Sequence, residues 1–126
     1  MSGDRRVLDT NVIVALLNGA PRLADRLSEA DWVGVSVISH IEFLAFRGLS
    51  QGDVDAFERF LRRVEVVGLT NGDEVLIKRI IEIRQSSGLR SPDAIIAATA
   101  ATCDATLVTA DTDSHKVPGL KVEAPV

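Results

Sequence analysis

The chain has 126 residues, 46% of them hydrophobic and 25% charged, which is typical of one globular domain with its own hydrophobic core. The single cysteine, Cys103, excludes a disulfide framework and a cysteine-ligated metal cluster, and no apolar run reaches the ~20 residues of a membrane span. The net charge of −4 does not favour the basic face by which most nucleic-acid-binding proteins are known. We therefore expect a single domain over residues 1–126, without a signal peptide, in the cytoplasm.

The first apolar stretch covers residues 7–17 and is interrupted once, by Asp9, Thr10 and Asn11. Residues 7–8 have the composition of a buried strand end, and residues 12–17 are apolar enough for a buried helix. Thr10 or Asn11 is expected to cap that helix, because their side chains can accept a hydrogen bond from a free backbone N–H. Asp9 then lies at the carboxyl end of the first strand, where open α/β sheets bind their ligands.

Further along the chain, β-branched runs alternate with segments of helical periodicity. Ser39 is predicted to cap the third helix, which would end at Gly48, and Ser91 with Pro92 to open the last one. The other predicted elements are helices over 22–30, 53–64, 75–87 and 94–101, and strands over 32–37, 64–69, 105–108 and 121–122. Strands separated by helices indicate an α/β fold with a mainly parallel sheet of four to five strands and helices on both faces.

Each acidic side chain near a predicted strand end has an ordinary structural explanation. Glu42 follows Ser39 by three residues, which is the spacing of a capping box. Asp93 lies in the first turn of a helix, where the helix dipole stabilises negative charge. Asp111 and Asp113 follow a strand, and aspartate is common in such turns. Taken one at a time, these acids are more simply structural than catalytic.

Taken together, the same acids predict a metal site. The carboxyl ends of parallel strands share one edge of the sheet, so Asp9, Glu42 and Asp111 must lie on the same side of the domain. Asp93 joins them only if its helix packs in the required place. Converging carboxylates repel one another unless cations are bound, and oxygen ligands without cysteine suit Mg²⁺ or Mn²⁺. Sites of this kind activate water for phosphodiester hydrolysis.

Four segments of the chain resemble the motifs of the PIN-domain ribonucleases, above all the VapC-type toxins of bacterial type II toxin–antitoxin pairs. They are residues 7–11 (VLDTN), 36–42 (SVISHIE), 92–100 (PDAIIAATA) and 107–113 (LVTADTD). They occur in the order of the family and are spread over most of the chain, from residue 7 to residue 113. One departure is that Ser114 and His115 follow Asp113, where the family often has an aromatic residue.

The resemblance implies a three-layer α/β/α sandwich, Mg²⁺- or Mn²⁺-dependent cleavage of RNA, a homodimer, and inhibition by a cognate antitoxin protein. By position, Asp9, Glu42, Asp93 and Asp111 would be the catalytic and metal-binding acids. Asp113 would be an accessory metal ligand, and Thr10 and Asn11 would support the site. The antitoxin would bind a groove formed by the early helices, with Leu16, Leu17 and Phe46 as lining residues.

Two other functions remain open. A Mg²⁺-dependent phosphoryl-transfer or phosphate-sensing domain has a similar build, but a phosphatase with a nucleophilic Asp9 would need a second acid at Asn11. A phosphate-accepting domain would need an aspartate at the end of the third strand, where residues 67–70 read VGLT. The third possibility is a binding module that keeps the fold without catalysis. In a nuclease, Arg47 and Arg90 are the cationic residues nearest in sequence to the acids and are the candidates for holding RNA.

Overall fold

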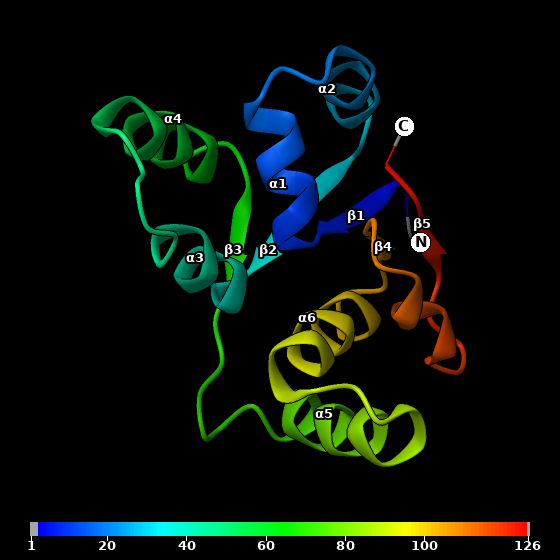
Figure 1. The fold of residues 1–126 in the computed structure, drawn as a ribbon. Coiled ribbons are helices and arrows are strands. Elements are labelled where there is room, and N and C mark those ends of the chain that lie inside the picture. The colour runs from blue at the N-terminus through cyan, green and yellow to red at the C-terminus, as the bar shows by residue number, and fades with distance from the viewer. Residues whose placement is uncertain (1–2, 126) are drawn as a thin grey trace.

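The computed structural model describes residues 3–125. Five strands form one parallel sheet in the order β3-β2-β1-β4-β5 (Figure 1). In chain order they are β1 (Arg5–Leu8), β2 (Trp32–Ser36), β3 (Glu65–Val67), β4 (Thr106–Val108) and β5 (Val122–Glu123). All four pairings between neighbouring strands are parallel, which confirms the predicted α/β class.

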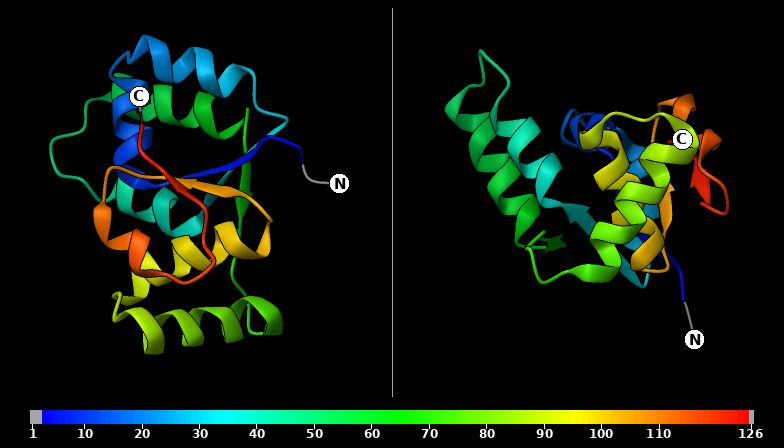
Figure 2. Two further views of the ribbon diagram at one scale, coloured as in Figure 1. Left: turned by 90° about the vertical axis from the view of Figure 1, so that its right-hand side faces the viewer. Right: turned by 90° about the horizontal axis from the view of Figure 1, so that it is seen from below.

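Helices cover both faces of the sheet. They are α1 (Thr10–Leu17), α2 (Pro21–Ser28), α3 (Val37–Leu44), α4 (Gln51–Leu61), α5 (Glu74–Ser87) and α6 (Ser91–Thr102), with a 3₁₀ helix at Thr112–Lys116. Figure 2 shows α2 and α4 on one side of the sheet and α5 and α6 on the other. The α3 helix contacts both α1 and α6. Within residues 3–125 no helix has the length and apolar character needed to cross a membrane.

Alternation along the central strand divides the core into two parts. Val7 and Leu8 are both 0% exposed, but successive side chains of a strand point to opposite faces. Val7 packs in a cluster with residues of α5, α6 and β4, and Leu8 packs in a second cluster with residues of α1, α2, α3 and α4. In the second cluster Phe43 and Phe57 are stacked, with their ring centroids 4.1 Å apart. The sheet is therefore held by hydrophobic burial on both faces, as a three-layer fold requires.

The first turns of α1 and α3 differ from the sequence prediction. Asp9 itself, rather than Thr10 or Asn11, is the N-cap of α1, and its carboxylate accepts a hydrogen bond from the Thr10 N–H. The N-cap of α3 is Ser36, whose hydroxyl accepts from the Ile38 N–H at 3.1 Å, so Ser39 is an interior helical residue. The predicted capping box between Ser39 and Glu42 is therefore wrong. The Glu42 carboxylate instead accepts a hydrogen bond from the Thr10 hydroxyl.

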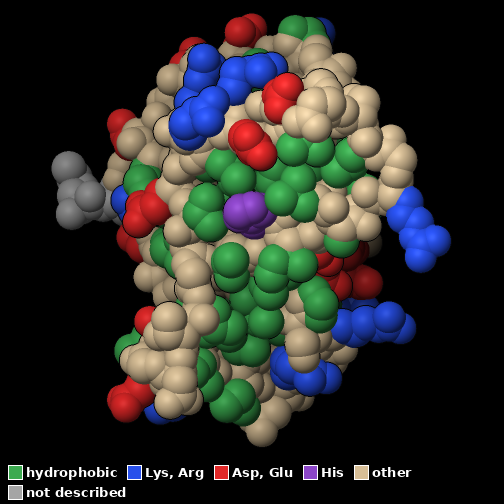
Figure 3. All heavy atoms as spheres, turned by 90° about the vertical axis from the view of Figure 1, so that its left-hand side faces the viewer, with side chains coloured by type: hydrophobic (Ala, Val, Ile, Leu, Met, Phe, Trp, Pro, Cys, Tyr) green, Lys and Arg blue, Asp and Glu red, His purple; other side chains and the backbone are tan. Residues whose placement is uncertain are grey.

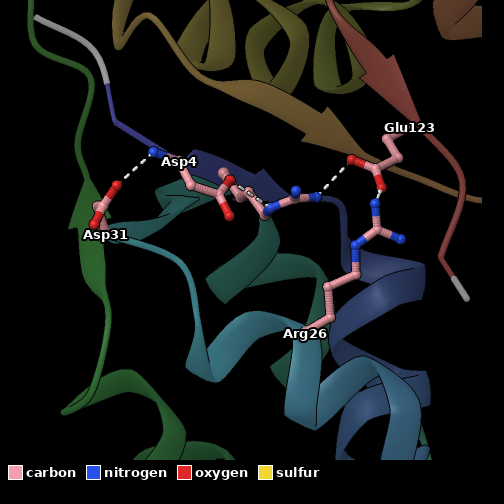
Figure 4. A network of polar contacts seen from close by, with 5 residues as sticks. Asp4, Arg26, Asp31 and Glu123 are labelled. Atoms are coloured by element: carbon pink, nitrogen blue, oxygen red, sulfur yellow. Dashed lines mark hydrogen bonds and ion pairs between the residues drawn. The ribbon is translucent and has the colours of Figure 1, made fainter.

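The short C-terminal strand is attached to the rest of the domain by charged side chains (Figure 4). The Glu123 carboxylate lies between two arginines, pairing with Arg26 of α2 and, at 2.5 Å, with Arg6 of β1. Arg6 also pairs with Asp4 at 2.8 Å. These contacts link β5 to β1 and α2 across β4.

Candidate active site

The strand order creates a crevice beside β1. From β1 the chain moves to β2 on one side, and it later returns to β4 on the other side. Parallel sheets bind ligands beyond the carboxyl ends of the strands at such a change of direction. Asp9 directly follows β1 and Thr109 directly follows β4, so both lie at this point.

The Asp9 carboxylate is held by hydrogen bonds on both oxygens. Its Oδ1 accepts from the Thr10 backbone N–H at 2.7 Å, and its Oδ2 accepts from the Thr109 hydroxyl at 2.6 Å and from the Asn11 amide at 3.4 Å. The side chain is 8% exposed. A buried carboxylate is tolerated when donors of this kind are present, and they also set its orientation.

Thr109 is a site residue that the sequence analysis did not single out. Its hydroxyl donates to Asp9, and its oxygen accepts from the Asp111 backbone N–H at 3.0 Å. Thr109 therefore connects the two acids that follow β1 and β4. The sequence contains a Thr-x-Asp pattern after the predicted strand. This pattern indicates a contact between Thr109 and Asp9 only when β4 is known to pair with β1.

Glu42 of α3 is linked to the start of α1 through Thr10. The Thr10 hydroxyl donates to Oε1 of Glu42 at 2.7 Å and lies 3.0 Å from the Ser39 hydroxyl. Asn11, the next residue, accepts a hydrogen bond from the Ala110 N–H at 3.2 Å and so contacts the segment after β4. Thr10 and Asn11 thus contact the acids and the loop that carries them.

The structure brings four of the five predicted acids to one open pocket of about 490 Å³. Its lining comprises Asp9, Thr10, Asn11, Glu42, Ala45, Phe46, Asp93 and Asp111. Asp113 is not part of the lining: it is exposed and pairs with Lys116 at 3.2 Å, while its N–H donates to Asp111. The candidate RNA-holding residues Arg47 and Arg90 are exposed and also lie outside the lining.

The electrostatics of the pocket are clearest at Asp93, the third residue of α6. Burial raises the pKa of the Asp93 carboxyl, and the negative charges of Asp9, Asp111, Glu42 and Asp113 raise that pKa further. Within residues 3–125 no hydrogen bond to the Asp93 carboxylate offsets this repulsion. The pocket therefore disfavours a full set of negative charges when nothing positive is bound.

The chemistry of the donors fits a hard divalent cation. Every charged group lining the pocket is a carboxylate, and oxygen ligands suit Mg²⁺ or Mn²⁺. Within the described part of the chain, however, no three Asp, Glu, His or Cys side chains are already arranged around a single metal position. Repulsion between carboxylates disfavours such an arrangement when no cation is bound.

The sequence profile of the PIN domain family matches residues 6–120, which is most of the chain and includes all the residues of the pocket. The chain belongs to the PIN domain family. Among curated proteins, no match to the sequence reaches significance.

Solved structures share this PIN fold over nearly their full length. One is VapBC2 from Rickettsia felis bound to a DNA fragment of its promoter, with 21% identity and a TM-score of 0.80, covering 95% of this chain and 98% of that chain. A second is DNA-bound VapBC from Salmonella typhimurium, with 19% identity and a TM-score of 0.79, covering 98% and 99%. A third is a toxin–antitoxin complex from Klebsiella pneumoniae, with 24% identity and a TM-score of 0.75, covering 96% and 98%. Because these sequence identities are 24% or lower, this structural similarity establishes the fold alone.

Proposed function

We propose that this PIN domain is a metal-dependent endoribonuclease and the toxin of a type II toxin–antitoxin pair. The observation that carries the proposal is the pocket lined by Asp9, Glu42, Asp93 and Asp111. Four carboxylates in one pocket cost folding free energy in the absence of a cation, which is unusual for a purely structural feature. The toxin assignment is supported by the shared fold with chains from complexes described as VapBC or as toxin–antitoxin.

In this proposal Mg²⁺ or Mn²⁺ is held by Asp9, Glu42, Asp93 and Asp111, with Asp113 as an accessory acid. Such a cation polarises the phosphodiester and lowers the pKa of water at the site. Asp9 is anchored by Thr109 and the start of α1, which keeps its carboxylate at the end of β1. Thr10 orients Glu42, and Asn11 holds the segment that leads to Asp111.

We expect the purified protein to cleave mixed RNA in Mg²⁺ or Mn²⁺, to stop in EDTA, and to resume when Mn²⁺ is added in excess. The protein is purified under denaturing conditions and refolded, so that a bound inhibitor is removed first. Cleavage is followed on a denaturing gel. Cleavage that continues in EDTA would exclude the metal-dependent mechanism, and refolded protein that cleaves no RNA would favour the non-catalytic binding module.

An apolar groove formed mainly by residues of α1, α2 and α4 is the proposed antitoxin site. It has a volume of about 490 Å³ and is lined by Leu16, Leu17, Ala24, Leu27, Ser28, Val33, Ala56, Arg59, Phe60, Arg63 and Val64. A second hollow of about 310 Å³ shares Leu17 and Ala56 with this groove and shares Phe46 with the acidic pocket. A helix seated in the groove could therefore continue past Phe46 and block the acids, which supports an inhibitory partner.

Replacing Ala24 by Arg is expected to abolish antitoxin binding while leaving RNA cleavage within about twofold of the unmodified protein. Ala24 is exposed on α2 and lines the groove, so a long charged side chain there would occupy the position of an apolar partner helix. The measurement is co-purification with the product of the adjacent reading frame. Ala124→Arg, at an exposed alanine outside the groove, is the matched control. Undiminished co-purification of Ala24→Arg would place the partner elsewhere.

The proposed homodimer is supported by a second apolar surface. Large hydrophobic side chains are exposed on neighbouring elements, including Ile41 and Leu44 of α3, which are 60% and 40% exposed, and Val66 of β3, which is 36% exposed. Figure 3 shows hydrophobic side chains gathered on the side of the molecule formed by α3, α4 and β3. Burial of such a patch against a second copy would remove apolar area from water.

A further inference from the structure

Two buried hydroxyls and a partly buried carboxylate form a chain of polar groups at the acidic pocket. The Ser39 hydroxyl of α3 lies 3.0 Å from the Thr10 hydroxyl of α1, and Thr10 lies 2.7 Å from Oε1 of Glu42. Ser39 is 0% exposed and Thr10 is 8% exposed. A hydroxyl has one proton to donate and a carboxylate only accepts, so the proton of Thr10 points to Glu42. Thr10 must then accept the proton of Ser39.

The helix itself does not account for the Ser39 hydroxyl. Ser36 supplies the N-cap of α3, and a serine inside a helix commonly donates to the carbonyl one turn earlier. Ser39 makes no such bond within residues 3–125, and its side chain bonds only Thr10 there. Burying a hydroxyl costs free energy unless the hydroxyl is paired. The partner of Ser39 is a residue that bonds an acid of the pocket, which makes the pair more than local packing.

We infer that Ser39 is a positioning residue for the metal site, an inference that rests on the proposed function. By donating to Thr10, Ser39 keeps the Thr10 proton on Oε1 of Glu42. No hydrogen bond within the described residues involves Oε2 of Glu42, so this oxygen remains available to ligate a cation. Without Ser39 the Thr10 hydroxyl can rotate among its staggered positions, and Glu42 loses a fixed orientation. Mutating a residue that hydrogen-bonds to a metal ligand typically weakens metal binding by ~10–100-fold.

The test measures Mn²⁺ binding to metal-free protein by isothermal titration calorimetry. Ser39→Ala is compared with Ser36→Ala, because both serines are 0% exposed, both lie in the start of α3, and each hydroxyl makes one hydrogen bond. Only Ser39 is connected to Glu42. We expect Ser39→Ala to raise the Mn²⁺ Kd by about tenfold, at the low end of the range for outer partners, and Ser36→Ala to leave it within about twofold. Both variants are expected to lower the melting temperature.

A double-mutant cycle separates positioning from packing. Thr10→Val removes the hydroxyl that joins Ser39 to Glu42 while keeping the shape of the side chain. On this background Ser39→Ala should weaken Mn²⁺ binding no further, because the connection is already broken. If Ser39→Ala does not fold, Ser39→Cys, which keeps the size but donates weakly, takes its place in both comparisons.

The outcomes distinguish this inference from the proposed function. Equal Mn²⁺ affinity of the Ser39 and Ser36 variants, with the unmodified protein binding Mn²⁺, overturns the role of Ser39 and leaves the metal site standing. An equal loss of affinity from Ser39→Ala with and without the Thr10 hydroxyl also overturns it. Unmodified protein that binds no Mn²⁺ overturns both the metal site and the role of Ser39.

Discussion

Replacing Asp9 by Asn is expected to reduce RNA cleavage by at least about 100-fold while the protein remains folded. Asp9 lies at the end of the central strand and, within residues 3–125, is the one acid of the pocket with hydrogen bonds to both α1 and the segment after β4. Loss of an outer partner of a metal ligand already costs ~10–100-fold, so loss of the ligand's own charge should cost more. The measurement is the rate of cleavage of a labelled RNA at saturating Mn²⁺.

The matched control for Asp9→Asn is Asp104→Asn. Asp104 is exposed, precedes β4 and so lies at the opposite end of that strand from the pocket, and has a positive φ of 52°, a conformation that asparagine also tolerates. Asp104→Asn removes one negative charge, as Asp9→Asn does, but at a position outside the acidic pocket. Asp9→Asn protein that is folded by circular dichroism and cleaves at more than a tenth of the normal rate would remove Asp9 from the mechanism.

The effect of Asp9→Asn on stability shows how the structure changes an expectation from sequence. From the sequence, a neutral residue in place of Asp9 is expected to leave the fold intact or slightly stabilised, because it relieves charge repulsion in the metal-free pocket. In the structure both oxygens of Asp9 accept hydrogen bonds, including one from the buried Thr109 hydroxyl. Losing those charge-assisted bonds opposes the relief of repulsion. We therefore expect no net stabilisation at Asp9, and expect it instead at Asp93.

The strands and helices themselves were largely predictable. The β-branched run from Trp32 predicts a strand over 32–37, and β2 covers Trp32–Ser36. The helical spacing after Asn71 predicts a helix over 75–87, and α5 covers Glu74–Ser87. The α5 helix shows helical hydrophobic periodicity, and β2 is a short β-branched run whose last three residues are all buried, so both can be recognised from the sequence. The predicted strand over 64–69 shortens to Glu65–Val67, because it lies at the edge of the sheet and pairs only with β2.

The contacts around the acids were less predictable, because they depend on which elements become neighbours. Ser36 and Ser39 are the same residue type three positions apart, and only the path of the chain after β2 decides which of them caps α3. Thr109 reaches Asp9 because β4 pairs with β1, which the order of strands along the chain does not reveal. The acidic residues could be named from the sequence, whereas the hydroxyls that hold them required the tertiary structure.

Replacing Asp93 by Asn is expected to reduce cleavage by at least about 100-fold and, unusually for a site residue, to stabilise the metal-free protein. The pKa of Asp93 is raised in the folded state by burial and by the surrounding carboxylates. A group with a raised folded pKa contributes stability at low pH, and that contribution is lost as the pH rises through the folded pKa. At neutral pH the ionised Asp93 therefore costs free energy, which a neutral Asn does not.

The size and pH dependence of the Asp93 effect can be measured by thermal unfolding in EDTA. At pH 7 the variant should melt roughly 1–3 °C higher, as expected for a few tenths of a kcal/mol in a domain of this size. Towards about pH 4, the ordinary range of an aspartate pKa, the difference should disappear because Asp93 becomes protonated in the unmodified protein. If Asp93→Asn is less stable than the unmodified protein, by the same amount at pH 7 and at pH 4, then charge repulsion at Asp93 does not lower the stability of the metal-free protein.

Adding Mn²⁺ should reverse the order of the melting temperatures of the unmodified protein and Asp93→Asn. A cation that binds the folded state stabilises it by RT ln(1 + [L]/Kd), about 2.7 kcal/mol when the concentration is 100 times Kd. The unmodified protein gains this stabilisation, and Asp93→Asn, with one charge fewer in the pocket, gains much less. The melting temperatures should therefore cross as Mn²⁺ is raised, with the variant more stable without metal and the unmodified protein more stable with it. If the melting temperatures of the two proteins rise in parallel with Mn²⁺ concentration and do not cross, the Asp93 carboxylate does not contribute to binding the cation. Asp93 would then have another role in the pocket.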